Sequence, residues 1–337
     1  MKAIFIERYG TPEKAFQIKE IPSPTPQSHQ VLIEVKAFGI NYADIMARQG
    51  MYRDAPKAPF VPGYEVAGIV KATCGNVTRF KQGDKVLAFT RFGGYATEAL
   101  TDERAVVKIP EKLSFEEATH FATQFCTAYY SAYTLANVQP EETVLVHAAA
   151  GGVGTALCQL LKLKNCKIYG TASSPAKLDF LKSQNVVPIN YRKEDFKQFF
   201  ENKNINPDVI FDSIGGATYK KGRQILAAGG RIIAYGGAGR SKGLLKTIKF
   251  ALDFGFIHPV ELLMKSQSAL GVNMLRIADH KPEVLQSVMQ NVIALYNEEK
   301  IHPVIDRVFN FSEIANAHKH IESRKSIGKV VVQTDKN

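Results

Sequence analysis

The sequence lacks the cysteine pattern that marks disulfide-stapled and zinc-knot proteins. Its four cysteines, Cys74, Cys126, Cys158 and Cys166, are scattered over 337 residues without a C-x-x-C pair. This spacing argues against both a disulfide framework and a cysteine-rich metal site. The cysteines are therefore expected to be free thiols in a reducing compartment.

Long apolar runs and blocks of like charge are also missing. The apolar runs fall well short of a bilayer span, and Met1–Gly10 lacks the apolar core of a signal peptide, so a cytoplasmic protein is expected. The formal net charge is +11, but the lysines are dispersed and no nucleic-acid motif accompanies them. This charge fits an anionic cofactor, and no nucleic acid is expected as a primary partner.

A glycine-rich turn at residues 148–154 separates a strand-like segment from a helix-like one. Thr143–His147 is a short apolar run rich in valine and leucine, and Gly152–Lys164 has apolar residues at helical spacing. Aligned with the dinucleotide fingerprint G-x-G-x-x-G, the turn has alanine at the first glycine position and glycine at the other two.

Each residue type in this turn has a physical role in binding a pyrophosphate. Gly151 lets the backbone approach the phosphates, and Gly154 lets the helix pack closely on the sheet. The helix N-terminus adds free N–H groups and the positive end of its dipole. A plain strand-to-helix turn also needs small residues, so the neighbouring segments must decide between the two interpretations.

The segments that follow alternate between strand and helix. Helical material is expected around residues 177–183 and 217–227. The strand-like runs are Lys167–Ala172, Val186–Asn190, Asp208–Ile214 and Arg231–Tyr235. Alternation of this kind predicts a parallel sheet of the Rossmann type, with the ligand at the C-terminal strand ends.

The end of the second strand indicates which nucleotide is bound. NAD enzymes usually place an acidic residue there for the ribose hydroxyls, but Thr171–Lys177 contains no carboxylate. Ser173, Ser174 and Lys177 offer two hydroxyls and a cation to a 2′-phosphate, and Tyr191 offers a third hydroxyl. The cofactor is therefore predicted to be NADPH. The alternatives are a solvated lysine at 177 and a packed tyrosine at 191.

The remaining chain predicts a second domain. With 45% hydrophobic residues, the chain can bury two cores. Short strands punctuated by glycine and proline before the turn suggest a partly open β-barrel. Strand-like residues near the C-terminus are expected to return to that domain. The predicted boundaries are 1–122 and 266–337 for the barrel domain and 123–265 for the Rossmann domain.

The order of several short motifs resembles that of a known family over nearly the whole chain. The motifs are Gly39–Asp44, Arg48–Tyr52, Pro62–Gly68, Gly83–Val86, residues 148–154, Asn310–His318 and Gly328–Val331. The chain resembles the medium-chain dehydrogenase/reductase superfamily, and within it the zinc-independent quinone oxidoreductases related to zeta-crystallin. This resemblance implies a GroES-like catalytic domain split around an NADPH-binding Rossmann domain, with the active site in the cleft between them.

The zinc alcohol dehydrogenases of this superfamily carry zinc ligands at positions that here hold Asn41, Tyr64 and Thr123. None of these three is a good zinc ligand, so no metal is expected. Hydride addition to a quinone or an α,β-unsaturated carbonyl compound needs no Lewis acid, which favours reduction of such substrates. The alternative function is an NADPH-binding regulatory or lipid-interacting protein with little turnover.

The resemblance also implies the site residues. Tyr52 matches the proton-donating tyrosine of related enoyl reductases, with Tyr42 and Tyr64 as competing phenols, and Asn41 lies near the nicotinamide. Asp44, Glu65 and His147 are interpreted as structural. The predicted cofactor-binding residues are Asn41, Thr127 at the start of a helix, Ala149, Gly151, Gly152, Val153, Gly154, Ser173, Ser174, Lys177, Tyr191, Asp212, Tyr235, Gly236 and Asn273.

The segment at residues 240–259 departs from the shorter quinone reductases. It combines basic residues with a broad apolar face and resembles the vesicle amine transport protein branch, a family associated with membranes as well as reductase chemistry. A helix covering the substrate cleft is favoured over one lying on anionic lipid. A homodimer is expected, formed through a free strand edge at Arg231–Tyr235.

Overall fold

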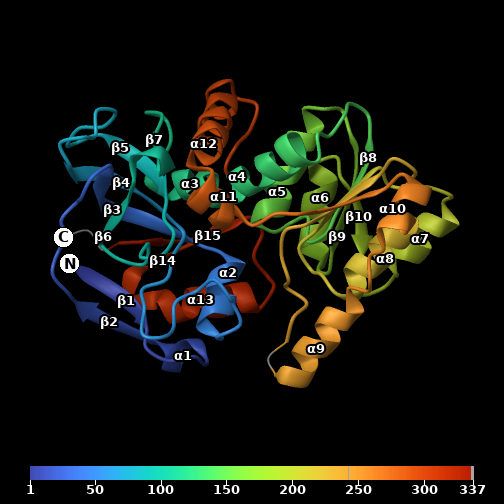
Figure 1. The fold of residues 1–337 in the computed structure, drawn as a ribbon, viewed down its shortest axis with the longest axis horizontal. Coiled ribbons are helices and arrows are strands. Elements are labelled where there is room, and N and C mark those ends of the chain that lie inside the picture. The colour runs from blue at the N-terminus through green and yellow to red at the C-terminus, as the bar shows by residue number, and fades with distance from the viewer. Residues whose placement is uncertain (242, 335–337) are drawn as a thin grey trace. The chain divides into compact units, whose positions relative to one another are not determined.

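The computed structural model describes residues 1–241 and 243–334, which form two compact units. Unit 1 comprises Met1–Cys126 and Met274–Asn337, and unit 2 comprises Thr127–Asn273 (Figure 1). The sequence-based expectation put the boundaries at 122/123 and 265/266 instead.

Unit 2 contains a six-stranded sheet in the order β10-β9-β8-β11-β12-β13, with every neighbouring pair parallel. This is the Rossmann strand order, so the predicted fold class is confirmed. The strands are β8 (Thr143–Val146), β9 (Lys167–Ala172), β10 (Val187–Asn190), β11 (Val209–Asp212), β12 (Arg231–Ala234) and β13 (Ser268–Gly271).

Helices connect these strands and supply the rest of the core of unit 2. Leu145, Ile210 and Ile232 from three adjacent strands pack with Phe200 and Tyr219 from two helices. The helices are α5 (Gly152–Lys162), α6 (Pro175–Ser183), α7 (Phe196–Asn202), α8 (Ala217–Ile225), α9 (Leu244–Asp253) and α10 (Pro259–Lys265). Strands buried on both faces explain the apolar runs seen in the sequence.

Unit 1 contains a two-stranded sheet, β1-β2, and a seven-stranded sheet in the order β14-β15-β3-β4-β5-β7, with β6 paired to β3. The sequence predicted all of these strands except β6. The strands are β1 (Lys2–Ile6), β2 (Phe16–Glu20), β3 (Gln30–Ile40), β4 (Glu65–Thr73), β5 (Lys85–Phe89), β6 (Glu98–Asp102), β7 (Val106–Lys108), β14 (Ile305–Asn310) and β15 (Lys329–Gln333). No pairing of described strands joins β14 to β7, so the GroES-like sheet stays open.

Helices of unit 1 come from both chain segments. They are α1 (Pro12–Ala15), α2 (Tyr42–Arg48), α3 (Phe115–His120), α11 (Met274–His280), α12 (Pro282–Asn297) and α13 (Ile314–Glu322), with short 3₁₀ turns at Glu103–Ala105 and Phe311–Glu313. After α3 the chain continues through a π-helical turn, Phe121–Phe125, into α4 (Cys126–Tyr129) and a second π-helical turn, Tyr130–Leu135. Strand β15 hydrogen-bonds antiparallel to β3, which places the C-terminal segment in the same sheet as the first.

Two expectations about unit 2 are wrong. Strand β12 has no free edge for a twin strand, because it hydrogen-bonds β11 on one side and β13 on the other. The terminal strand of the described sheet is β13. Thr127 does not begin a helix but lies inside α4, so it is no helix cap.

The expected burial of the apolar segment at residues 240–259 is not found. The segment forms α9 and the approach to α10, and its residue 242 lies outside the described residues. Phe254 packs against Tyr219 of α8, with ring centroids 5.3 Å apart. Other apolar side chains of the segment are exposed to solvent: Leu245 is 81% exposed and Phe256 is 89% exposed.

Candidate functional site

The glycine-rich turn of unit 2 is held by hydrogen bonds to the neighbouring strand β9. The backbone N–H of Ala148 donates to Thr171 Oγ1 at 3.1 Å, and that of Ala149 donates to the Thr171 carbonyl at 3.1 Å. Helix α5 then begins at Gly152 behind the N-cap residue Gly151, which has no side chain to cap it. The first turn of a helix that begins after a glycine-rich turn is the kind of backbone that binds a pyrophosphate, and α5 has this arrangement.

Gly154 explains why this turn needs a glycine inside the helix. A Cβ atom at residue 154 would lie 2.4 Å from the carbonyl oxygen of Ala148, which is backbone and cannot move aside cheaply. At Gly151 the nearest atom, the same oxygen, is 3.2 Å away. The close packing expected of Gly154 is thus observed, whereas a Cβ atom at residue 151 would be less crowded.

The predicted phosphate-binding residues lie at the C-terminal ends of β9 and β10. These strands are parallel neighbours, with Asn190 opposite Ala172, and the N–H of Tyr191 donates to the Ala172 carbonyl at 3.2 Å. Ser174 is the N-cap of α6 but makes no side-chain capping bond. Lys177 lies in the first turn of α6. The four predicted residues thus follow the C-terminal ends of two neighbouring parallel strands.

Asp212 shapes the loop after β11 rather than pointing freely at a ligand. Its Oδ1 accepts hydrogen bonds from the N–H groups of Ile214 at 2.6 Å and Gly215 at 3.0 Å, while the buried Oδ2 has no partner. The N–H of Tyr235 donates to the Asp212 carbonyl at 3.0 Å. Gly236 lies next to Tyr235 in the loop after β12, whereas Asn273 is an exposed residue just after β13.

His147 is buried at the end of β8, as predicted, but it is not fully satisfied. It is 2% exposed, and its Nδ1 lies 3.2 Å from Thr171 Oγ1, while its Nε2 has no partner among the described residues. Burial lowers the pKa of this imidazole, and the nearby Asp212 carboxylate partly opposes that shift. The neutral ring therefore prevails at neutral pH.

In unit 1, Asn41 caps helix α2 and joins four buried polar groups. Its backbone N–H donates to Asp44 Oδ2 at 2.8 Å. Its side-chain Nδ2 donates to Glu65 Oε1 at 2.8 Å, and its Oδ1 accepts from Gln124 Nε2 and Lys329 Nζ, both at 3.1 Å. The interpretation of Asp44 as a loop-holding carboxylate agrees with this capping bond.

Glu65 has a different role from the one expected from the sequence, which was to hold a loop by hydrogen bonds. It forms an ion pair with Lys329, and both side chains are 0% exposed. Gly39 makes room for this pair, because a Cβ atom there would lie 2.1 Å from Lys329 Cε. Sequence reasoning missed Lys329. Lys329 entered the sequence analysis only as part of the motif Gly328–Val331. No local sequence pattern identifies a lysine whose burial depends on the tertiary fold.

The three candidate phenols differ in burial. The rings of Tyr52 and Tyr64 lie 6.0 Å apart, so these two residues are brought together. Tyr64 is 3% exposed with an unpartnered hydroxyl, whereas Tyr42 is 37% exposed. Burial, assisted by Asp54 and Asp44, raises the pKa of Tyr52 to about 12, and burial with Asp44 raises the pKa of Tyr64 further. Both phenols keep their protons at neutral pH and act as hydrogen-bond donors.

The donor set of unit 1 does not fit zinc. Asn41, Tyr64 and Thr123 supply an amide and two hydroxyls where a zinc site needs nitrogen, sulfur or carboxylate ligands. Within residues 1–241 and 243–334, no group of three or more His, Cys, Asp or Glu side chains is arranged to hold a metal ion. Zinc independence remains a prediction.

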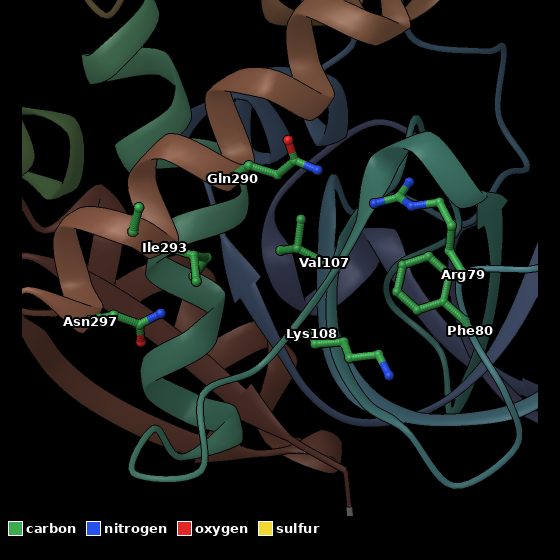
Figure 2. A pocket seen from close by; sticks show the side chains of 8 residues that line it. Arg79, Phe80, Val107, Lys108, Gln290, Ile293 and Asn297 are labelled. Atoms are coloured by element: carbon green, nitrogen blue, oxygen red, sulfur yellow. The ribbon is translucent and has the colours of Figure 1, made fainter.

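A separate pocket of about 390 Å³ lies in unit 1, between α12 and the region of β7. Figure 2 shows Gln290, Ile293 and Asn297 on α12 and Val107 and Lys108 on β7. Lys108 is paired with Asp84 at 3.0 Å. None of the residues predicted from the sequence lines this pocket, so it is distinct from the candidate site.

Comparison with known proteins shows the class of protein to which this chain belongs. An alcohol dehydrogenase GroES-like domain matches residues 27–111, and a zinc-binding dehydrogenase domain matches residues 181–332. The human synaptic vesicle membrane protein VAT-1 homolog is 33% identical over 342 residues, covering 98% of this chain and 86% of that protein. Human quinone oxidoreductase is 31% identical over 339 residues, covering 98% of this chain and 97% of that protein.

A solved structure agrees with these relatives. Quinone oxidoreductase of Escherichia coli, in complex with NADPH, superimposes with a TM-score of 0.87 at 26% identity, covering 99% of this chain and 100% of that one. The chain belongs to the medium-chain dehydrogenase/reductase superfamily of oxidoreductases, in the group that contains the quinone oxidoreductases and the VAT-1 homologues. The resemblance read from the motifs is confirmed.

The packing at the turn gives a first testable prediction. Gly154→Ala is expected to lower the free energy of unfolding by about 1–3 kcal/mol, because the added methyl group must displace the backbone at Ala148. Gly151→Ala is the matched control and should cost less, since it meets one atom at 3.2 Å. Urea unfolding measures both. Equal losses for the two variants would show that close packing is not the reason for Gly154.

A second prediction concerns pH. Burial is the main cause that raises the pKa of Asp44 from 3.8 to about 7. Between these values the folded protein holds a proton that the unfolded chain has released, so this group makes stability fall as pH rises. Asp44→Asn should therefore gain stability relative to wild type between pH 4 and 7, by ~4 kcal/mol at most.

Thermal unfolding of both proteins across this pH range measures the effect. Asp84→Asn is the control of opposite sign, since hydrogen bonds and the Lys108 ammonium hold the pKa of Asp84 below its ordinary value. The stability lost in that variant should shrink as pH falls. A pH-independent difference between Asp44→Asn and wild type would contradict the prediction.

Proposed function

We propose that this protein is an NADPH-dependent reductase that transfers hydride to a quinone or an α,β-unsaturated carbonyl compound without zinc. The observation that carries the cofactor choice is the sheet edge at β9 and β10. Ser173, Ser174, Lys177 and Tyr191 follow these two neighbouring strands, and no carboxylate lies in residues 171–178 to repel a 2′-phosphate. The family relationship supports the reductase class.

The residues of unit 2 have separable tasks in this proposal. The N-terminal turn of α5 binds the pyrophosphate, and Gly151, which has no side chain, lets the phosphates approach the backbone. Lys177 supplies the charge that distinguishes a 2′-phosphate from a 2′-hydroxyl. Bound NADPH would supply the hydride.

The residues of unit 1 stabilise the charge that this hydride creates. Addition to a quinone or a conjugated C=C bond leaves negative charge on an oxygen, which protonated phenols and amide N–H groups stabilise. Tyr52, Tyr64 and Asn41 are such donors. Because the pKa of Tyr52 is raised to about 12, its role in the ground state is to donate a hydrogen bond.

A second candidate function, contact with an anionic membrane surface, is favoured by the exposed apolar side of α9 and α10. Its exposed side chains are Leu245, Ile248, Leu252, Phe256, Ile257, Val260, Leu263 and Met264. Lys246 and Lys249 flank them on α9. An apolar face bordered by lysines is the composition of an interfacial helix. None of the helices formed by the described residues has the length and apolar character that crossing a membrane requires.

The reductase is tested by following NADPH absorbance with a panel of quinones, enones and enoyl thioesters. Lys177→Ala is expected to raise KM for NADPH about 10- to 100-fold and to leave KM for NADH nearly unchanged, because only NADPH carries the 2′-phosphate. Lys182→Ala, on the same helix and paired with Asp179, is the control and should change neither constant. Tight NADPH binding without substrate-dependent oxidation across the panel would sink the enzyme hypothesis for these substrates.

Membrane contact is tested by flotation with vesicles of phosphatidylcholine alone or with phosphatidylserine. Wild type should float with the anionic vesicles, and the Phe256→Ser/Leu263→Ser and Lys246→Glu/Lys249→Glu variants should remain at the bottom of the gradient. Ile18→Ser removes an exposed apolar residue of unit 1 and should float as wild type does. Equal flotation of all four proteins would exclude α9 and α10 as the contact.

A further inference from the structure

The orientation of the Asn41 amide is fixed by its neighbours. Lys329 Nζ and Gln124 Nε2 are donors and face Asn41 Oδ1, while the Glu65 carboxylate is an acceptor and faces Nδ2. Rotating the amide by half a turn would place donor against donor twice and acceptor against acceptor once. In a buried site these mismatches are expensive, so a single orientation is populated.

This arrangement leaves one amide hydrogen unused. An asparagine Nδ2 has two hydrogens, and among the described residues the structure records one acceptor for it, Glu65 Oε1. The hydroxyl of Tyr64, the residue next to Glu65, is also buried without a partner. Asn41 follows β3 and Tyr64 precedes β4, and these two strands pair with Phe38 opposite Val66. The two unused donors therefore lie at the same end of one strand pair.

Two neutral donors at the same end of one strand pair, each with a hydrogen for which the described residues record no acceptor, suit an oxygen from outside the chain that gains negative charge. We infer that Lys329, held by Glu65, is a positioning residue for hydride transfer, fixing the Asn41 amide so that its free N–H faces an oxygen of the substrate or the cofactor. This inference deepens the proposed reductase function and rests on it. Lys329 itself does not contact the reacting atoms.

The charge of Lys329 matters as well as its hydrogen bond. An ammonium bound to the amide oxygen forms a charge-assisted bond, which is roughly twice as strong as a neutral one. Without this ammonium, the Glu65 carboxylate that accepts from Asn41 Nδ2 would be buried without its counter-ion.

Variants that remove one or both charges distinguish an effect of Lys329 on catalysis from its effect on folding stability. Lys329→Met and Glu65→Gln each leave one buried charge without its counter-ion, and each should lower Tm by about 5–10 °C in the protein without nucleotide. In the Lys329→Met/Glu65→Gln double variant both charges are gone, so Tm should recover most of this loss. If Lys329 positions Asn41, kcat of the double variant should remain at least about tenfold below wild type while KM for NADPH changes less than about threefold.

The control is a second ion pair of unit 1, in which only the cation is fully buried. Arg48 is 1% exposed and pairs with Glu322, which is 30% exposed. Arg48→Met should lower Tm in the same way but leave kcat at the wild-type value, because Asn41 is untouched. A double Lys329/Glu65 variant that recovers both Tm and kcat would show that the pair is only structural and would overturn the inference.

Glu65→Gln gives an independent readout if the double variant fails to fold. Lys329 faces two carboxylates, Glu65 and Asp44, and burial already lowers its pKa. Without Glu65 that pKa falls further, so kcat of Glu65→Gln should decline at a lower pH than kcat of wild type. A wild-type pH profile in Glu65→Gln would also overturn the inference. Absence of turnover in wild type would instead refute the proposed function, and this inference with it.

Discussion

The buried ion pair between Lys329 and Glu65 is the interaction on which the organisation of unit 1 depends. It joins β15, from the end of the chain, to the first residue of β4, and the two side chains meet over Gly39 of β3. Neither charge can be removed alone without leaving the other buried and unpaired. The pair thus ties the returning C-terminal segment to the first one and, through the same ammonium, fixes Asn41.

The candidate residues of the two units are held by opposite physical means. Unit 2 uses backbone groups and missing side chains: the uncapped first turn of α5, and glycines that let the chain approach itself or a ligand. Unit 1 uses buried side chains whose donors and acceptors must match. The first arrangement suits phosphate groups that every dinucleotide shares, whereas the second suits discrimination between particular oxygens.

The sequence was most informative where local pattern and chemistry coincide. Strand β9 and helix α6 follow from the local pattern of residues 167–172 and 177–183. The end of β9 is informative because the sequence itself shows that no carboxylate lies there. Lys329 was not readable, because a lysine in a strand is ordinarily exposed and only the pairing of β15 with β3 buries it. Thr127 was misplaced because two π-helical turns extend the helical segment on both sides of α4.

The wrong assignment of a free edge to β12 has a similar origin. Strand β13 is four residues long and half-exposed, and it follows the apolar helices α9 and α10. Short strands carry little periodicity, so the sequence ended the sheet one strand too early.

The net charge of the buried cluster connects these observations. Lys329 and Glu65 cancel, so the cluster is neutral when Asp44 is protonated and carries one negative charge when Asp44 is ionised. Burial raises the pKa of Asp44 to about 7, and its Oδ1, which has no partner, is free to carry the proton while Oδ2 accepts from Asn41. In the proposed reductase, a neutral cluster would not repel the negative charge that hydride addition places on a nearby oxygen, whereas an ionised Asp44 would. The same burial that destabilises the ionised carboxylate would then keep the surroundings of Asn41 and Tyr64 suited to an anionic transition state.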